Sequence, residues 1–200
     1  MGDGAEGSRG QEDITARALE FQILTCVRPA NVRLAVWSEI DGNVWEIPGE
    51  EVEEGGQRMK TGEPHRVPLC KRAIEILDSL PRIAGNEHIF PGAGRAGVLG
   101  PDALNRMAKS SGYVDPKQQD RPISAHGFRS TFSTWGGERS NFAYEVREFC
   151  LAHDVKSEVA RAYNRGDLFD KRRKVMDAWA RYCESPIADT ANVTELHGAA

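Results

Sequence analysis

"HGFRSTFSTWGGERSNFAYEVREFCLAHDVKSEVARAYNRGDLFDKRR" is the sequence of residues 126–173. It holds two histidines, a tyrosine and a run of arginines between apolar residues at helical spacing. His126 and Arg129 lie three positions apart just after Ser124, a residue type that caps helices, so both side chains can project from the first turn of one helix. These polar groups are either the solvent-facing sides of a helical bundle or one site built around a phosphate.

The composition indicates one ordinary globular domain. The chain has 200 residues, of which 40% are apolar, enough for a core without disulfides or metals. The four cysteines (Cys26, Cys70, Cys150 and Cys183) are widely spaced and form no CxxC pair, which indicates reduced thiols in a cytosolic protein and argues against zinc. No apolar run is long enough for a membrane span. We therefore expect a soluble, cytoplasmic protein.

Charge is distributed unevenly along the chain. The net charge is −4, but residues 39–54 carry seven acidic residues and no base, and residues 1–20 carry five acidic residues against two bases. The remainder is therefore net positive. Residues 161–174 alone hold six lysines or arginines. Such a basic run is either a phosphate-facing surface or a solvated helix face.

The apolar periodicity predicts a mainly α (α+β) fold with a small antiparallel sheet of three strands. The Asp41-Gly42 turn predicts a hairpin within residues 34–50, and residues 65–70 supply the third strand. Helices are expected at the following ranges: 14–28, a short one from Pro29, 73–80, 102–110, 124–139, 143–153, 156–164 and 167–183. Residues 14–183 form the domain, while 1–13 are expected to be an unstructured or non-native start and 184–200 a flexible tail.

Several single polar residues have both a structural and a functional interpretation. Arg28 stands between an apolar helix and Pro29, where it either satisfies the helix end or meets an anion. Lys60 lies in a glycine-containing loop and is either solvent-exposed or functional. His153 and Tyr163 fit a helix cap and a core position equally well when each is taken alone.

Taken together and in chain order, these residues resemble a known family. Arg28, Lys60, "HGFR" (His126 and Arg129), "LAH" (His153) and "AYNRGDLFDKRR" (Tyr163) look like the Arg, Lys, His-x-x-Arg, His, Tyr series of tyrosine recombinases. The segments "LTCVRPANVRLAVWSEID", "RMKTGEPHRVPL" and "HGFRSTFSTW" are similar to the catalytic domain of P4-like phage integrases. The resemblance covers roughly residues 14–183.

The resemblance implies a site-specific DNA recombinase that cleaves and rejoins DNA through a 3′-phosphotyrosyl link. Tyr163 would be the nucleophile and Lys60 the general acid for the leaving 5′-oxygen. Arg28 and Arg129 would neutralise the phosphate, which is why no metal or other cofactor is expected. His126 would assist proton transfer, and His153 would donate a hydrogen bond to the phosphate. The implied partners are double-stranded DNA at attachment sites and other recombinase protomers, four in the full-length enzyme's synapse.

Two features depart from the family pattern. Relatives usually have an acid three residues after the first arginine, whereas this chain has Asn31, which accepts a hydrogen bond but carries no charge. Nothing before residue 14 resembles a core-binding or arm-binding domain, so we expect either a separated catalytic domain or a gene remnant. The alternatives are a DNA-binding remnant without turnover, a purely structural helical domain, and a type IB topoisomerase, which shares the chemistry.

Overall fold

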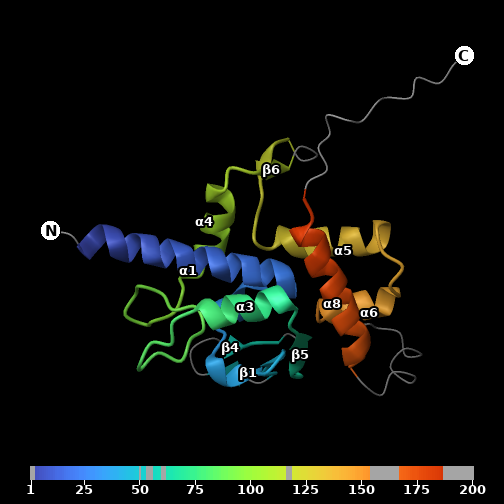
Figure 1. The fold of residues 1–200 in the computed structure, drawn as a ribbon, viewed down its shortest axis with the longest axis horizontal. Coiled ribbons are helices and arrows are strands. Elements are labelled where there is room, and N and C mark those ends of the chain that lie inside the picture. Colours follow the sequence, from blue (N-terminus) through green and yellow to red (C-terminus); the bar gives the residue numbers. More distant parts are fainter. Residues whose placement is uncertain are drawn as a thin grey trace, which may run out of the picture.

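The structure is a computed structural model. It describes residues 3–49, 51–52, 56–59, 62–115, 119–153 and 167–186. The longest element, α1 (Asp3–Thr25), runs through the middle of the molecule, with α3 (Lys71–Ser79) on one side and α4 (Ala103–Ser110) on the other (Figure 1). A short helix, α2 (Pro29–Arg33), follows α1 directly. The elements around α1 form one half of the fold.

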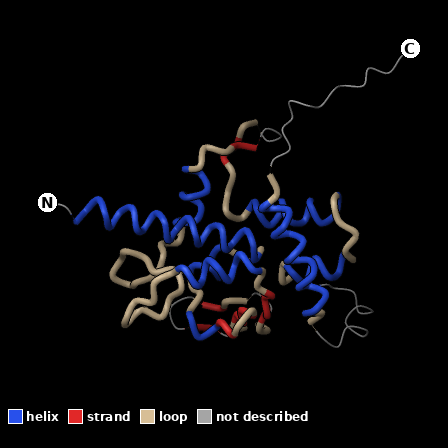
Figure 2. The backbone as a smooth tube through the Cα atoms, in the orientation of Figure 1, coloured by secondary structure: helices blue, strands red, loops and turns tan. Residues whose placement is uncertain are grey.

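A small antiparallel sheet lies beneath α1 and α3 in this half (Figure 2). Its strands are β1 (Ile40–Asp41), β2 (Val44–Ile47) and β5 (His65–Pro68), in the order β1-β2-β5. A single 3-10 turn, η1 (Trp37–Glu39), leads into β1. Two shorter pairs join β3 (Glu51–Val52) to β4 (Gly56–Gln57) and β6 (Val114–Asp115) to β7 (Arg121–Pro122).

The first hydrophobic core lies between α1, the sheet and α3. Phe21 of α1 packs against Trp45 of β2 and against Phe90, with ring centroids 5.4 Å apart in both pairs. All three rings are fully buried, and Ile76 of α3 joins them. This aromatic contact sets the distance between α1 and the sheet.

The second core is formed by the C-terminal helices α5 (Gly127–Glu138), α6 (Tyr144–Cys150) and α8 (Phe169–Glu184). Phe132, Trp135 and Trp179 contact one another with centroid distances between 5.2 and 5.8 Å. The Trp179 indole N–H donates to the Ile23 carbonyl of α1 at 2.8 Å. The two halves of the fold therefore meet at the C-terminal end of α1.

The predicted fold class is confirmed: the described chain is mainly helical with one three-stranded antiparallel sheet. The hairpin forms at Asp41-Gly42, where Gly42 has a φ of +55°. Its first strand is only two residues long, because η1 occupies the positions before it. The helix expected at 156–164 lies outside the described residues.

Several helix boundaries differ from the expected ones, and three of the differences bear on the domain limits or on the site. The helix expected from residue 14 begins at Asp3, within the range 1–13 that we expected to be unstructured. Each further residue is easy to add to a helix once the packed part has formed. The helix expected at 124–139 begins at Gly127, because the Ser124 hydroxyl accepts the Gly127 N–H at 3.1 Å and makes a turn ahead of it. The helix expected to reach 153 ends at Cys150.

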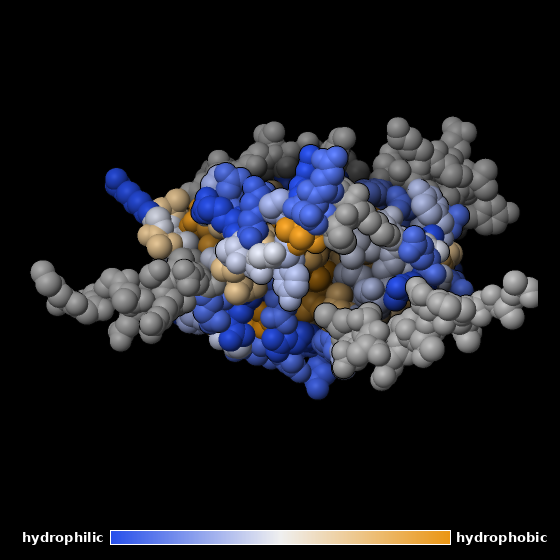
Figure 3. Space-filling view, turned by 90° about the horizontal axis from the view of Figure 1, so that it is seen from above, coloured by the Kyte–Doolittle hydropathy of each residue, from blue (hydrophilic) through white to orange (hydrophobic). Residues whose placement is uncertain are grey.

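The surface is mainly hydrophilic on the face shown in Figure 3, where apolar side chains appear as small patches near the middle. Among the large apolar side chains that the structure describes, Tyr113 and Tyr144 are the most exposed. Within the described part of the chain, no helix has the length and hydrophobicity needed to cross a membrane.

The junction between the two halves predicts a stability difference between two aromatic substitutions. Trp179→Phe removes the hydrogen bond to the Ile23 carbonyl and leaves a void in the second core, so it should lower the free energy of unfolding by about 2–3 kcal/mol. Tyr182→Phe keeps the ring that stacks on Trp179 and loses only a hydroxyl on a residue that is 39% exposed. It should change stability by less than about 0.5 kcal/mol. Urea denaturation measures both, and equal losses would contradict this account of the junction.

Candidate functional site

Arg129 is the buried centre of the candidate site. It lies in the first turn of α5, is 5% exposed, and donates to the carbonyl oxygens of Cys26 and, at 2.7 Å, of Leu151. Burial, followed by the nearby charge of Arg28, lowers the Arg129 pKa to about 10. The guanidinium therefore stays charged at neutral pH and joins the ends of α1 and α6.

Arg28 brings the second positive charge. It is half-buried at the N-cap of α2 in an extended conformation, and it lines a pocket of about 370 Å³ together with Arg129. Within the described residues, the Arg28 guanidinium has no hydrogen-bonding or ion-pair partner. Two guanidiniums on one pocket repel each other, so an anion that contacts both would be strongly favoured.

Both predicted histidines line the same pocket. His126 is exposed at the N-cap of α5, while His153 follows the end of α6. Ser130, Ser133 and Thr134 complete the polar wall. The structure therefore brings together four of the six predicted site residues (Arg28, His126, Arg129 and His153).

The hydrogen bonds of His153 define its tautomer. Its Nε2 lies 3.2 Å from the Arg129 guanidinium, and its Nδ1 lies 2.8 Å from a Glu148 carboxylate oxygen. A guanidinium only donates, so Nε2 must accept and the proton must sit on Nδ1, facing Glu148. In this state His153 cannot donate from Nε2. An anion in the pocket would have to take the Arg129 donor away before His153 could bind the anion as well.

The other two predicted residues, Lys60 and Tyr163, lie outside the described residues. Their neighbours in the chain are placed. Met59, which precedes Lys60 in the sequence, lines a narrow cavity with Arg28 and Arg129. Tyr163 stands ten positions after His153 and four before Asp167.

The residue before Met59 is held by a buried ion pair. Arg58 donates to Glu39 at 2.8 Å and to the Leu34 carbonyl at 3.0 Å, and the side chains of the ion pair are 2% and 8% exposed. Arg58 also donates to the Asn31 carbonyl at 3.3 Å. The chain leading to Lys60 is thus attached to α2, the helix that begins at Arg28.

Asn31 occupies the position where relatives usually have an acid. It is 3% exposed, and its side-chain amide donates to the Met59 sulfur at 3.6 Å. The expected hydrogen bond from Arg28 to the Asn31 side chain is not among the contacts between described residues. Asn31 therefore contributes a contact with Met59 rather than a charge near Arg28.

His65 was missed by the sequence analysis. It opens β5 and lines the narrow cavity between Arg28 and Arg129, and its buried Nε2 has no partner among the described residues. Desolvation, followed by the charges of Arg172, Arg129 and Arg28, lowers its pKa to about 3, while a hydrogen bond to the Cys150 backbone acts in the opposite direction. A neutral imidazole thus lines the same cavity as the two arginines. The sequence signal was weak, because the histidine stood in an ordinary strand.

Arg172 was interpreted as part of a basic, solvent-facing or phosphate-facing run, and this interpretation is wrong for this residue. Arg172 is 1% exposed and donates to the Arg66 carbonyl of β5 at 2.6 Å. It also pairs with Asp167 at 2.8 Å. Its neighbours in sequence, Lys171 and Lys174, are exposed.

Comparison with known proteins places the chain among integrases. No family model matches it. It is 35% identical over 181 residues to prophage integrase IntA of Escherichia coli K12, covering 88% of this chain and 40% of the relative. It is 33% identical over 181 residues to the integrase of Enterobacteria phage P4, covering 86% and 40%. The chain thus spans about 40% of the length of these relatives.

Solved structures show the same fold. The integrase of mycobacterium phage Brujita superposes with a TM-score of 0.62 at 16% identity, over 88% of this chain and 54% of that one. A lambda integrase (75–356) dimer bound to a COC′ core site gives 0.50 at 22% identity, over 70% and 50%. The architecture is the one that these integrase structures share. The chain belongs to the tyrosine recombinase family, and within it to the group of P4-like integrases.

The half-buried His65, whose Nε2 is enclosed, predicts acid sensitivity. Its pKa is about 3 in the folded chain against 6.5 as the ordinary value, so between these values the unfolded chain binds a proton that the folded chain does not. Stability therefore falls as the pH falls from 6.5 towards 3, by at most about 2 kcal/mol at pH 5. Urea titrations at pH 7 and pH 5 should show a smaller loss on acidification for His65→Gln than for the wild type.

The matched control is His126→Gln, which removes an exposed histidine from the same site. This variant should keep the wild-type dependence of stability on pH. If the wild type and His65→Gln lose the same free energy between pH 7 and pH 5, His65 is not the buried neutral group described here.

Proposed function

We propose that this chain is the catalytic domain of a site-specific DNA recombinase, an integrase that cleaves and rejoins DNA through a 3′-phosphotyrosyl intermediate. The observation that carries the proposal is the pocket where Arg28 and Arg129 meet beside His126 and His153. A phosphodiester is an anion whose non-bridging oxygens match two guanidiniums. The proposal also rests on the similarity to integrases along 86–88% of the chain.

The two arginines stabilise the charge that builds on phosphorus in the transition state. The Arg129 guanidinium is held by two backbone carbonyls, whereas for Arg28 only the backbone is held, at the start of α2. Donors that are already oriented need no rearrangement when the charge develops, which is the main source of electrostatic catalysis. Arg28 offers its unpaired N–H groups to one oxygen, and Arg129 offers the N–H that otherwise bonds His153 to another.

Tyr163 is the proposed nucleophile. Its phenol oxygen attacks phosphorus and loses its proton, the bond from phosphorus to the 5′-oxygen breaks, and Lys60 gives a proton to the departing 5′-oxygen. His126 assists the proton transfer at the tyrosine. The link formed is a 3′-phosphotyrosine, and attack by a 5′-hydroxyl reverses every step. Since a free phenol has a pKa of about 10, assistance in removing its proton is needed at neutral pH.

In this scheme the Nε2 of His153 first accepts a hydrogen bond from Arg129 and later donates one to the phosphate. Glu148 holds its Nδ1 proton, so the ring is oriented with Nε2 towards the pocket. Once the phosphate takes the Arg129 donor, Nε2 is released, and a second proton lets it donate to a phosphate oxygen.

The partners of the domain follow from the same proposal. The substrate is duplex DNA at attachment sites in the bacterial cytosol, on nucleoid DNA. Lambda integrase has been solved as a tetramer bound to a Holliday junction, with a TM-score of 0.50 to this chain. By analogy, we propose that the full-length enzyme acts as a tetramer.

The nucleophile is tested by Tyr163→Phe, which removes one oxygen and keeps the ring. Covalent adducts with a nicked attachment-site duplex should disappear, while duplex binding stays within about twofold, because the ring's contacts remain. Denaturing gels count the adducts. Tyr144→Phe, at a tyrosine that is 60% exposed on α6, is the control and should form adducts at the wild-type rate. Persistent adducts in Tyr163→Phe would exclude this assignment.

The general acid is tested by Lys60→Ala. Cleavage of an ordinary phosphodiester should slow by about 10²-fold or more, the usual scale of acid–base assistance. A bridging 5′-phosphorothiolate leaves as a weakly basic thiolate and should restore the rate. Lys71→Ala, whose side chain is 92% exposed on α3, serves as the control and should cleave both substrates normally. Equal defects of Lys60→Ala on both substrates would rule out proton donation.

A further inference from the structure

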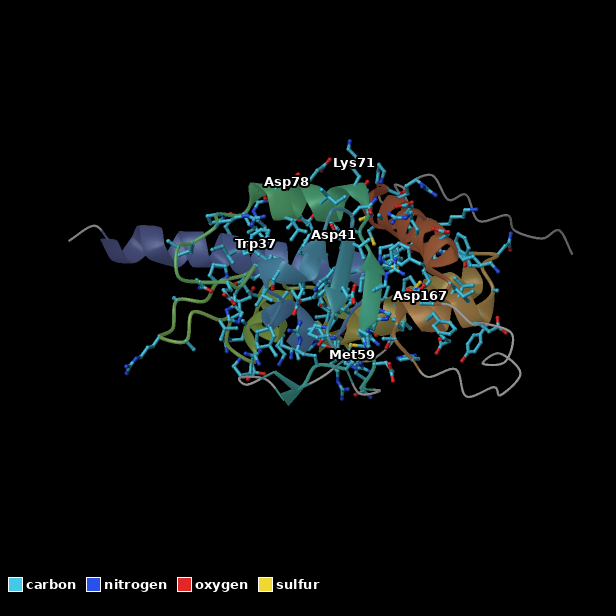
Figure 4. All side chains as sticks on the ribbon, turned by 90° about the horizontal axis from the view of Figure 1, so that it is seen from below. Trp37, Asp41, Met59, Lys71, Asp78 and Asp167 are labelled. Carbon is cyan, nitrogen blue, oxygen red and sulfur yellow. The ribbon has the colours of Figure 1, made fainter. Side chains whose placement is uncertain are left out.

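A buried arginine fastens the start of α8 to strand β5. The Arg172 guanidinium donates from Nη1 to the Arg66 carbonyl at 2.6 Å and from Nε to the Asp167 carbonyl at 2.7 Å. Its Nη2 donates to the Asp167 carboxylate at 2.8 Å. Figure 4 shows Asp167 beside this strand, at the edge that faces the C-terminal helices. One side chain thus joins segments about a hundred positions apart in sequence.

The chain around this contact is strongly constrained. Leu168, immediately before α8, has a φ of +52°, a left-handed conformation that costs a bulky residue of order 1 kcal/mol or more. The Leu168 carbonyl accepts from the Arg172 N–H at 2.9 Å, and the Asp167 carboxylate accepts from the Phe169 N–H at 3.2 Å. Arg66 pairs with the same carboxylate at 3.4 Å and covers the Phe169 ring at 4.2 Å. Several contacts therefore hold Asp167 in one place.

The position of Asp167 matters because it lies four residues after Tyr163. Four residues of extended chain span at most about 14 Å, so the location of Asp167 limits where the tyrosine reaches. The strand to which Asp167 is fastened starts at His65, five residues after Lys60. The same strand also contacts the helix that precedes Tyr163 in the sequence, because His65 bonds the backbone of Cys150 at the end of α6.

We propose that Arg172 is a positioning residue for the nucleophile: it holds Asp167, four residues after Tyr163, beside β5 and so limits where the tyrosine can reach. The inference rests on the proposed function, since it assigns Arg172 an effect on Tyr163 chemistry alone. Arg172 touches neither Arg28 nor His126 and lines neither pocket that contains Arg129. Only a planar guanidinium reaches all three acceptors at once, and lysine keeps the charge but not the geometry.

The test measures covalent attachment to a nicked duplex in single turnover over a range of DNA concentrations. Arg172→Lys should attach about 10- to 100-fold more slowly at saturating DNA, since a displacement of about 1 Å costs this much in a positioned reaction. The DNA concentration for half-saturation should stay within about twofold, because no phosphate contact is lost. Arg173→Lys makes the same change next along the helix, at a half-buried arginine, and should behave as wild type.

A substrate with a better leaving group distinguishes a misplaced tyrosine from a defect in proton donation. If Arg172→Lys attaches slowly to the ordinary duplex, it should attach equally slowly to one with a bridging 5′-phosphorothiolate. That substrate compensates for lost proton donation but not for a misplaced tyrosine. Rescue by this substrate would overturn the inference. So would a defect seen only as a higher half-saturating DNA concentration, because that would make Arg172 a DNA contact.

Asp167→Asn provides a second variant if Arg172→Lys does not fold. The Asp167 side chain is 39% exposed, and asparagine still accepts the Phe169 N–H, so the fold should survive. Its attachment rate should fall severalfold, whereas Asp170→Asn, at an exposed carboxylate one turn on, should not change. Wild-type rates in Asp167→Asn, or in a folded Arg172→Lys, would overturn the positioning role while leaving the proposed function intact. Absence of Tyr163-dependent adducts in the wild type would overturn both.

Discussion

The buried guanidinium of Arg129 is the constraint on which the arrangement of the C-terminal half depends. A charge with 5% exposure is tolerated only when its donors are satisfied, and here the Cys26 and Leu151 carbonyls accept them. Cys26 ends α1 with a φ of +56°, and the Gln22 side chain ties the same helix end to the Ala125 carbonyl at 2.9 Å. Three helix ends are thereby brought to one point, which is where the candidate pocket forms.

The electrostatics of the pocket follow from this placement. Burial and Arg28 lower the Arg129 pKa to about 10, so the two guanidiniums destabilise each other without either losing its proton. His65 lines a cavity with both of them and is neutral, since burial and the charges of three arginines lower its pKa to about 3. The free domain therefore carries unrelieved positive charge that a phosphate would neutralise, and part of the affinity for that phosphate is stored in the folded state.

Much of the fold could be predicted from the sequence, because its signals are local. The Asp41-Gly42 turn, the helical periodicity and the HxxR pair after Ser124 each depend on neighbours a few residues away. Whether a charged side chain is buried depends instead on residues far away in the sequence. Arg172 and Lys171 are adjacent in one basic run, yet the first is enclosed and the second is exposed, because only Arg172 faces a strand from residues 65–68. His65 could not be found for the same reason: its partners come from α2, α5 and α6.

The two kinds of functional group in the proposed site are held by different means. Of the two arginines proposed to bind the phosphate, Arg129 is held by backbone carbonyls and Arg28 directly precedes α2, so the position of both backbones is set once the fold forms. The chain near Lys60 and the chain near Tyr163 are held by ion pairs, Arg58 with Glu39 and Arg172 with Asp167. The first ion pair is connected to the pocket by residues of α2 and the second by residues of β5. A change in either pair could therefore misplace Lys60 or Tyr163 without moving the arginines. Under the proposed function, the fold would thus separate stabilisation of the phosphate from delivery of the groups that make and break its bonds.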